Sequence, residues 1–380
     1  MTPTEITLIA PGSAALPPNS STSIEIYLYD LWRTLRKRVD TRLYGCREVL
    51  SGGPHHQRRT VLEKAAGRRY VTAVLEDLRA SSGASTQVVQ VDNRPAHVQP
   101  VRLQMPSCGL VLGLHSLTFL QPQRIGRAGA ANALGSVDQI VVNSSYLQNA
   151  LHDSFPRVSG DCQVIYPGVD CDLFHPCISH QERLARSELR RRLGVRQEIA
   201  VLFVGRVIER KGVAIAIEAL RALRLQFGVQ AVLWVAGPGP HQGSRYARVL
   251  RRLAKGVPVR LLGMVKRSRL PDLYRASDLF VCPSQQPEAL GLVNLEAQAC
   301  GLPVVASNDW GIRESVGNGR SGTLVSSYKS PVAFAKALSQ LARDEDMRRT
   351  YGTAGALWMR ERWSWERSAE EYMRMYSRIR

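Results

Sequence analysis

Several kinds of residue are scarce in the 380-residue sequence, and each shortage argues against a class of protein. No apolar run reaches the roughly 20 residues that a membrane-spanning helix needs, since the best candidate, 109–120, is shorter and contains a histidine. The first residues show no basic segment ahead of an apolar one, so no secretory signal is expected. The seven cysteines form no Cys-x-x-Cys pair and are odd in number, which favours free thiols in a reducing cytosol over disulfides or a metal site.

Acidic residues are also few relative to basic ones. Lys and Arg number 51 against 32 Asp and Glu, which gives a formal net charge of +19, and only 7 of the 51 are lysines. A positive surface attracts polyanions, anionic lipid or phosphorylated ligands, although solvated faces of amphipathic helices are a simpler explanation. No aromatic residues interleave with the cations in a nucleic-acid-binding pattern, so nucleic acid is not expected as a partner. The basic segments are 33–42, 186–196, 245–256 and 265–269.

Short apolar runs that alternate with helical stretches are abundant. In the second half, the strand pattern of 199–207 is followed by the helical spacing of 211–228, and the alternation then continues. Unbroken runs of Val, Ile and Leu are typical of parallel strands that are covered on both faces, which predicts a doubly wound α/β sheet. The first half shows the same alternation less clearly, and 40–86 fits it poorly.

The length predicts more than one domain, because 380 residues are too many for a single ordinary core. Ligands of doubly wound sheets bind at the carboxyl ends of the strands, so the site is expected there. The predicted divisions are two Rossmann-like domains at 1–175 and 176–355, and a final helix at 356–380 that packs back on the first domain.

The stretch "PEALGLVNLEAQACGLPVVAS" (287–307) combines two acids with the start of a helix. It predicts a helix that begins near Leu290 or Gly291 and is stopped by a glycine. Glu288 precedes this helix, and Glu296 follows about 8 Å along its axis. Because a helix N-terminus attracts anions, a phosphate there would have one acid on either side, one for a sugar and one for a ribose diol. The alternative is a pair of surface acids, which fits poorly with an otherwise apolar helix.

A second stretch, "VGRVIERKG" (204–212), adds two cations on a strand-to-helix turn. Arg206 and Lys211 each have a glycine beside them, which suits a diphosphate that approaches the backbone closely. Alone, this pattern would fit a surface pair equally well. Together with the two acids, it indicates a nucleoside-diphosphate site.

These segments, together with "GIRESVGNGRSGTLV" (311–325) and "VIYPGVD" (164–170), resemble the retaining glycosyltransferases of the GT-B fold, family 4, whose motif is E-x7-E. The resemblance covers 137–325 most specifically and the rest more loosely. It implies two Rossmann-like domains with a cleft between them, the first for the acceptor and the second for a UDP- or GDP-sugar donor. The acceptor would be a glycan, a lipid or a protein.

The same resemblance implies transfer with retention and no metal or other cofactor, since cations and a helix dipole offset the charge of the leaving diphosphate. No DxD-type metal motif stands beside the donor features. Glu288 would contact the donor sugar near the reacting carbon. Arg206 and Lys211 would bind the diphosphate, and the amides of Gly291 and Leu292 would hold phosphate. Glu296 would bind the ribose, and Val265 and its loop would lie against the base.

The first domain supplies one candidate catalytic residue and a candidate acceptor side. His115 ends the apolar run 109–115 and matches a histidine that the family places near the donor sugar, while a structural histidine is the alternative. "VDNRP" (91–95) ends another strand and would bring Asn93 and Arg94 to the acceptor side. Together with "LHSLTF", this segment resembles a subgroup associated with bacterial spore coats. The expected location is cytoplasmic, and association with a spore coat or peripherally with anionic membrane is left open.

Two departures from the family pattern affect the expected activity. After the first strand, the usual glycine pair is reduced to Gly12, which also belongs to the expected acceptor side. Trp310 stands where the family has the first glycine of another pair, so the sugar pocket is expected to be narrowed or reshaped. These departures leave open a catalytically silent GT-B scaffold or a coat-associated binding protein.

Overall fold

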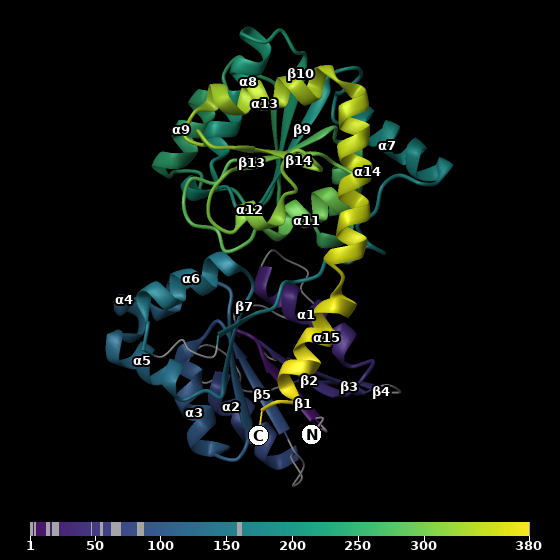
Figure 1. Ribbon diagram of the computed structural model, residues 1–380. Coiled ribbons are helices and arrows are strands. Elements are labelled where there is room, and N and C mark those ends of the chain that lie inside the picture. Colours follow the sequence, from purple (N-terminus) through teal and green to yellow (C-terminus); the bar gives the residue numbers. More distant parts are fainter. Residues whose placement is uncertain are drawn as a thin grey trace. The chain divides into compact units, whose positions relative to one another are not determined.

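The computed structural model describes residues 3, 5–12, 16, 23–46, 48–53, 56–61, 70–81, 87–157 and 162–379. Its internal contacts divide the chain into two units (Figure 1). Unit 1 comprises Met1–Gly168 and Trp365–Arg380, and unit 2 comprises Val169–Ser364. Each unit has a β-sheet of its own with helices packed on it.

Unit 1 is built on an eight-stranded sheet in the order β4-β3-β2-β1-β5-β6-β7-β8. All neighbouring strands are parallel except β2 with β3 and β3 with β4, which are antiparallel. The strand order reverses at β1 and β5, which is where ligands of such sheets bind. The strands are β1 (Glu5–Ile9), β2 (Asp40–Gly45), β3 (Glu48–Gly53), β4 (His56–Val61), β5 (Gln87–Asp92), β6 (Gly109–Leu114), β7 (Gln139–Val142) and β8 (Cys162–Val164).

The helices of unit 1 come from both ends of the chain. The last helix packs beside the first, and their aromatic residues Tyr27, Trp32, Trp365 and Tyr372 share one buried core (Figure 1). The described residues within 40–86, which the sequence pattern placed poorly, contribute β2, β3, β4 and α2. The helices are α1 (Ser23–Leu35), α2 (Tyr70–Ser81), α3 (Val98–Gln104), α4 (Pro122–Ile125), α5 (Arg127–Gly135), α6 (Ser145–Ser154) and α15 (Trp365–Tyr376).

Unit 2 has a six-stranded, wholly parallel sheet in the order β11-β10-β9-β12-β13-β14. The strand order reverses between β9 and β12, so the segments after these two strands emerge side by side. The strands are β9 (Ile199–Val204), β10 (Ala231–Ala236), β11 (Val259–Gly263), β12 (Leu279–Cys282), β13 (Val304–Ser307) and β14 (Gly322–Val325).

The helices of unit 2 cover the apolar strands, and residues of α8 and α13 share one core cluster with residues of β9, β10 and β12. No helix in the described part of the chain combines the length and the apolarity that crossing a bilayer requires. The helices are α7 (His180–Arg192), α8 (Val213–Leu225), α9 (Arg245–Leu253), α10 (Leu270–Ala276), α11 (Leu292–Ala299), α12 (Ile312–Ser315), α13 (Pro331–Arg343) and α14 (Glu345–Arg362).

The division between the units differs from the predicted boundaries at 175 and 355. The chain leaves unit 1 after Gly168 and returns to it at Trp365. Val169 donates its N–H to the carbonyl of Trp363 at 2.7 Å, so both ends of unit 2 are held together. Helix α14 packs on α11 within unit 2, so the predicted final helix at 356–380 is in fact the end of α14 followed by α15.

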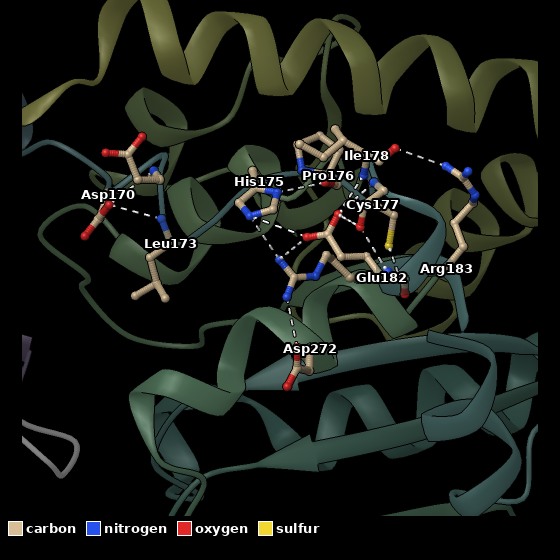
Figure 2. Close-up of polar contacts among 12 residues, drawn as sticks. Asp170, Leu173, His175, Pro176, Cys177, Ile178, Glu182, Arg183 and Asp272 are labelled. Carbon is tan, nitrogen blue, oxygen red and sulfur yellow. Dashed lines mark hydrogen bonds and ion pairs between the residues drawn. The ribbon is translucent and has the colours of Figure 1, made fainter. Parts of the chain in front are cut away.

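Polar contacts fix the start of unit 2 (Figure 2). The Oδ1 atom of Asp170 accepts the N–H groups of Asp172 and Leu173 at 3.2 and 3.1 Å, which caps the first turn. Ser179 and Glu182 form a capping box at the start of α7, in which each side chain accepts the other residue's backbone N–H. The backbone N–H of Ser179 is the main reason why the pKa of Glu182 falls to about 2.

A charge substitution at Glu182 should change the acid stability of the protein. Because folding lowers the pKa of this carboxyl from 4.5 to about 2, its stabilising effect is present above 4.5 and is lost as the pH falls through about 2. We expect Glu182→Gln to lower the free energy of unfolding at neutral pH by about 0.3–1 kcal/mol, the usual effect of an acid at a helix N-terminus. Urea titrations from neutral pH to pH 2 should show this gap closing. A gap that stays constant would contradict the assignment.

Candidate active site

The turn after β9 and the loop after β12 meet at the switch point of the unit 2 sheet. Lys211 donates from Nζ to Oε2 of Glu288 at 2.5 Å, and the two side chains are 19% and 17% exposed. Gly212 follows with a φ of 74°, and a Cβ there would lie 1.8 Å from the carbonyl oxygen of Pro283. The close approach of the two segments therefore requires glycine at this position.

Cys282, the last residue of β12, lies close enough to this ion pair to interact electrostatically with both of its charges. Burial raises the pKa of its thiol to about 11, and Lys211 and Glu288 are among the charges that act on it. The thiol thus stays protonated at neutral pH and serves as a packing group. Lys211 and Glu288 thus meet beyond the carboxyl ends of β9 and β12, the kind of sheet edge at which the sequence analysis expected the site.

Helix α11 presents its N-terminus to the same region. It begins at Leu292, one or two residues later than predicted, with Gly291 as N-cap at a φ of 88°. No side chain caps this end, and the described residues supply no acceptor for the backbone N–H groups of Leu292 and Val293. Two donors at the positive end of a helix are therefore left for a ligand.

A buried polar network behind α11 fixes this end of the helix. It was not found from the sequence, in which it consists of ordinary amides and hydroxyls. Asn294 donates to Oγ of Ser315 at 3.0 Å, and Gln298 donates to the carbonyls of Asn294 and Ser315 at 2.8 and 2.7 Å. Ser321 completes the network through Oε1 of Gln298 at 2.5 Å. All four side chains are fully buried, so the geometry of the helix start is firmly set.

The loop at 309–312 packs against the segment that carries Glu288. Gly311 donates its N–H to the carbonyl of Glu288 at 3.1 Å, and a Cβ at Gly311 would lie 1.7 Å from the carbonyl oxygen of Ala289. Trp310, which departs from the family pattern, keeps a φ of 51°, a conformation that glycine adopts more readily. Its ring lies 5.2 Å from that of Tyr328.

Glu296 is oriented by a tyrosine that the sequence analysis missed. The hydroxyl of Tyr274 on α10 donates to Oε2 of Glu296 at 2.9 Å. Tyr274 is fully buried, and burial is the main reason why its pKa lies well above its ordinary value, so it remains a donor. Arg275, the next residue on α10, forms ion pairs with Glu182 at 3.6 Å and with Asp272 at 2.9 Å. Figure 2 labels both of these acidic residues.

Arg206 and Val265 are less closely connected to this cluster. Arg206 is exposed, and its guanidinium makes no hydrogen bond or ion pair with the described parts of the chain. Val265 is half-buried in the loop after β11. The turns that carry them are linked by backbone hydrogen bonds through the end of β10. The N–H of Gly205 donates to the carbonyl of Ala236 at 2.9 Å, and the N–H of Gly237 donates to the carbonyl of Gly263 at 2.7 Å. Within residues 162–379 and the other described ranges, no three His, Cys, Asp or Glu side chains form a metal-binding group.

His115 lies in unit 1, where buried residues hold its ring. Its Nε2 lies 3.0 Å from Oδ1 of Asp92, a carboxylate with no exposed surface. Gln90 donates from Nε2 to both oxygens of Asp92, at 3.2 and 3.0 Å, and the hydroxyl of Tyr376 donates to Oε1 of Gln90 at 2.6 Å. The ring of Tyr27 packs edge-on at 4.5 Å. A hydrogen-bonded chain thus links His115 to α15.

The other predicted residues of unit 1 lie at the ends of adjacent strands. Asn93 takes a φ of 51°, and its Oδ1 accepts the N–H groups of His115 and Ser116, both at 3.2 Å. Arg94 stacks its guanidinium 3.9 Å from the ring centroid of Phe119. Gly12 follows β1, and a Cβ there would lie 2.6 Å from the ring of Tyr70. The predicted residues therefore form two separate groups, one in each unit.

Comparisons with known proteins agree with this fold. Residues 185–358 match the family described as Glycosyl transferases group 1. Spore coat protein SA of Bacillus subtilis (strain 168) is 28% identical over 385 residues, covering 99% of this chain and 100% of that protein. Alpha-maltose-1-phosphate synthase of Mycolicibacterium smegmatis is 31% identical over 290 residues, covering 71% of this chain and 73% of that protein.

Solved structures define the class of fold. Sucrose-phosphate synthase from Thermosynechococcus elongatus matches with a TM-score of 0.78 and 22% identity, over 99% of this chain and 98% of that one. HepE of Anabaena, solved in complex with UDP and glucose, matches with a TM-score of 0.77 and 22% identity, over 99% and 100% of the two chains. The fold is thus that of the GT-B proteins, as predicted. The chain belongs to the group 1 glycosyltransferases, and the predicted enzyme class is confirmed.

Proposed function

We propose that this enzyme transfers a sugar, with retention of configuration, from a nucleoside-diphosphate sugar to a hydroxyl of its acceptor. The observation that carries the proposal is the Lys211–Glu288 ion pair beside the uncapped start of α11. A cation and free helix amides at one strand-end suit a diphosphate, and the neighbouring carboxylate suits a sugar hydroxyl. The complex of HepE with UDP and glucose supports the same donor class.

The residues would share the work of breaking the bond between the sugar and the diphosphate. Negative charge grows on the diphosphate as it leaves, and Lys211 and the amides of Leu292 and Val293 would stabilise that charge. Arg206, whose guanidinium has no partner among the described residues, would swing onto the same group. Glu296, held by Tyr274, would accept hydrogen bonds from the ribose diol.

Glu288 and His115 are the proposed catalytic residues. When the donor binds, its diphosphate would pair with the ammonium group of Lys211. Glu288 would then lose its ion pair with Lys211 and accept a hydrogen bond from a sugar hydroxyl instead. His115, which Asp92 orients, would contact the donor sugar. Val265 and its loop would lie against the base.

The donor panel tests this proposal. Purified protein is incubated with UDP-, GDP- and ADP-sugars, and donor hydrolysis and transfer are followed by release of the nucleotide. We expect turnover with one nucleotide class and a product whose anomeric configuration, read by NMR, is that of the donor. The proposal fails if no nucleotide binds at millimolar concentration. A product with inverted anomeric configuration would contradict retention and leave the proposed sugar transfer standing.

We also propose that transfer needs no metal, because Lys211, Arg206 and the helix dipole would offset the charge of the leaving group. Turnover should then persist after dialysis against a chelator. Loss of turnover that added Mg²⁺ or Mn²⁺ restores would contradict this.

Removing the hydroxyl of Tyr274 should weaken nucleotide binding. Tyr274→Phe removes the hydroxyl that donates to Oε2 of Glu296, so the carboxylate is less well oriented for the ribose. We expect the Kd for the preferred nucleoside diphosphate to rise about 5- to 30-fold, the equivalent of about 1–2 kcal/mol for a hydrogen bond to a charged group. Isothermal titration calorimetry measures this change. Tyr351→Phe on α14 serves as the control and should bind normally.

A second candidate function is a coat-associated binding protein without turnover. The likeness to spore coat protein SA over the full length of both chains favours it, as do the departures at Gly12 and Trp310. Nucleotide binding without hydrolysis or transfer across many acceptors would support this alternative. Turnover of any nucleotide sugar would exclude it. The cytoplasmic and spore-coat locations stay predictions.

Peripheral contact with anionic membrane is a further part of the proposal. The outer face of α9 carries four exposed arginines, and no acidic residue occurs between 237 and 271. Such a face attracts anionic headgroups. Co-sedimentation with vesicles should rise when phosphatidylserine is included, and equal partitioning with neutral vesicles would remove membrane contact. The arginines are Arg245, Arg248, Arg251 and Arg252.

A further inference from the structure

Unit 1 contains two cations that share one aromatic ring. Arg94 follows β5, and Arg124 lies in α4, on the segment after β6. The guanidinium carbon of Arg94 lies 3.9 Å from the centroid of Phe119, and that of Arg124 lies 5.8 Å from it. Since β5 and β6 are neighbours in the sheet, both arginines belong to the same strand-end region.

Neither guanidinium is neutralised by an ion pair with the described residues. The side-chain hydrogen bond of Arg94 runs from Nη1 to the carbonyl of Asn93 at 3.0 Å, which uses only part of its donor capacity. Arg124 is exposed, and Phe119 is its contact among the described side chains. Two guanidinium groups with free donors at one edge of a sheet are typical of an anion site.

The electrostatic surroundings of Arg94 favour a bound anion. Burial lowers the pKa of the Arg94 guanidinium, the carboxylate of Glu25 opposes this shift, and the charge of Arg124 adds to it. Glu25 on α1 is 1% exposed and supplies one negative charge against two positive ones. A partly desolvated cation beside a like charge is stabilised when an anion binds.

A neutral histidine lies close to Arg94, because the backbone N–H of His97 donates to the carbonyl of Arg94 at 2.9 Å. Burial, together with the charge of Arg94, lowers the pKa of His97 to about 4, so its imidazole is uncharged at neutral pH. Its Nδ1 is buried and has no hydrogen-bond partner within the described residues. An unpaired buried polar atom is costly, and a ligand oxygen or hydroxyl can satisfy it.

The two arginines are connected to the segment that carries His115. The carbonyl of Asn93 accepts a hydrogen bond from the guanidinium of Arg94, and its side-chain Oδ1 accepts the backbone N–H of His115 at 3.2 Å. An anion held by Arg94 would therefore lie near the histidine that is proposed to contact the donor sugar. The acceptor of the reaction has to approach the same histidine.

We infer that Arg94 and Arg124 form an acceptor subsite for an anionic group, a phosphate or a carboxylate carried by the molecule that receives the sugar. The inference rests on the proposed transfer reaction and specifies the chemical class of its acceptor. Arg94 is the principal ligand because it is stacked and half-buried. Arg124, which is exposed, adds long-range electrostatic attraction and a second guanidinium group that can donate hydrogen bonds to the anion.

Binding of inorganic phosphate tests the subsite without transfer. Calorimetry is carried out on enzyme saturated with its preferred nucleoside diphosphate, so that the donor site is filled, and also on Lys211→Ala without nucleotide. We expect Arg94→Gln to weaken phosphate binding about tenfold or more and Arg124→Gln by less, since bidentate charge-assisted bonds contribute most. Arg127→Gln, an exposed neighbour at the start of α5, should bind phosphate normally.

A variant that keeps the charge separates binding from packing. Arg94→Lys retains the cation and loses the planar fork, so it should keep part of the phosphate affinity that Arg94→Gln loses. Thermal melts of both variants report on folding. If both melt as the wild type does and bind phosphate equally well, Arg94 is a packing residue and the inference is wrong.

Matched acceptors identify the source of the anion. Transfer is measured to glucose, glucose 6-phosphate and glucuronate, and to vesicles of phosphatidylcholine with and without phosphatidylinositol. We expect an anionic acceptor to be preferred by about tenfold or more in kcat/KM, with the preference lost in Arg94→Gln. Equal use of neutral and anionic acceptors, with no phosphate bound in either background, would overturn the inference. If no nucleotide binds, the proposed function fails instead, and the phosphate titration still decides whether the subsite exists.

Discussion

Lys211→Ala lowers kcat/KM for the donor sugar by about 10²- to 10³-fold, if Lys211 stabilises the leaving diphosphate. The Lys211 side chain is 19% exposed and its ammonium group is held by the ion pair with Glu288, so its charge acts in a partly desolvated site. The loss should occur in kcat as well as in the Kd for nucleoside diphosphate, because charge develops as the bond breaks. Steady-state kinetics of donor hydrolysis measures both.

Two further variants control for this result. Lys336→Ala removes an exposed lysine of α13, far along the chain from the turn after β9, and should leave the kinetics unchanged. Glu288→Gln keeps the shape of the partner and removes its charge, so it should lower kcat while nucleotide affinity stays close to that of the wild type. A loss below about threefold in Lys211→Ala would mean that the diphosphate is bound elsewhere.

His115→Ala should give the second large effect, a fall in kcat of about 10²-fold with nucleotide affinity unchanged. His115 lies in unit 1 and the proposed nucleotide contacts lie in unit 2, so the variant separates sugar chemistry from nucleotide binding. Asp92→Asn keeps the volume and loses the carboxylate that holds Nε2, and it should lower kcat about tenfold.

The hydrogen-bonded chain behind His115 extends this prediction to α15. Tyr376→Phe removes the donor to Gln90, which in turn holds Asp92, so a smaller fall in kcat is expected than in Asp92→Asn. His180→Ala, at the exposed start of α7, is the control. Wild-type turnover by His115→Ala would reduce this histidine to a structural residue, the alternative that its position in the sequence left open.

The proximity of Lys211 and Glu288 could be predicted because both residues lie in short motifs. Lys211 follows one apolar strand and Glu288 follows another, and parallel strands bring such ends together at one edge. Gly291 and Glu296 belong to the same local pattern. The sequence could not show that Lys211 and Glu288 pair directly, since that contact depends on the packing of Gly212 against Pro283.

The supporting residues could not be predicted because their contacts span the chain. Tyr376 reaches Gln90 across 286 positions, and Tyr274 reaches Glu296 from another helix. Neither has a spacing or a neighbouring glycine that marks it. For Asp92 the sequence held one signal, the glycine at position 113 on the next strand. A Cβ at Gly113 would lie 2.2 Å from the carboxylate of Asp92.

The strand pattern of residues 40–86 was weak for a physical reason. The strands β3 and β4 form an antiparallel extension at one edge of the sheet, and their sequences, EVLSGG and HQRRTV, lack the apolar runs of buried parallel strands. The domain boundary was misplaced for another reason. The chain crosses to unit 2 directly after the Pro167–Gly168 pair, and the residues that follow bond within unit 2.

The most direct test compares nucleoside diphosphate with nucleoside monophosphate in the wild type and in Lys211→Ala. If a diphosphate lies between Lys211 and the free amides of α11, the wild type should bind the diphosphate about tenfold or more tightly than the monophosphate, as measured by calorimetry. In Lys211→Ala this difference should shrink to within about threefold. Equal affinity of the wild type for the two nucleotides would contradict the diphosphate site and the function proposed from it.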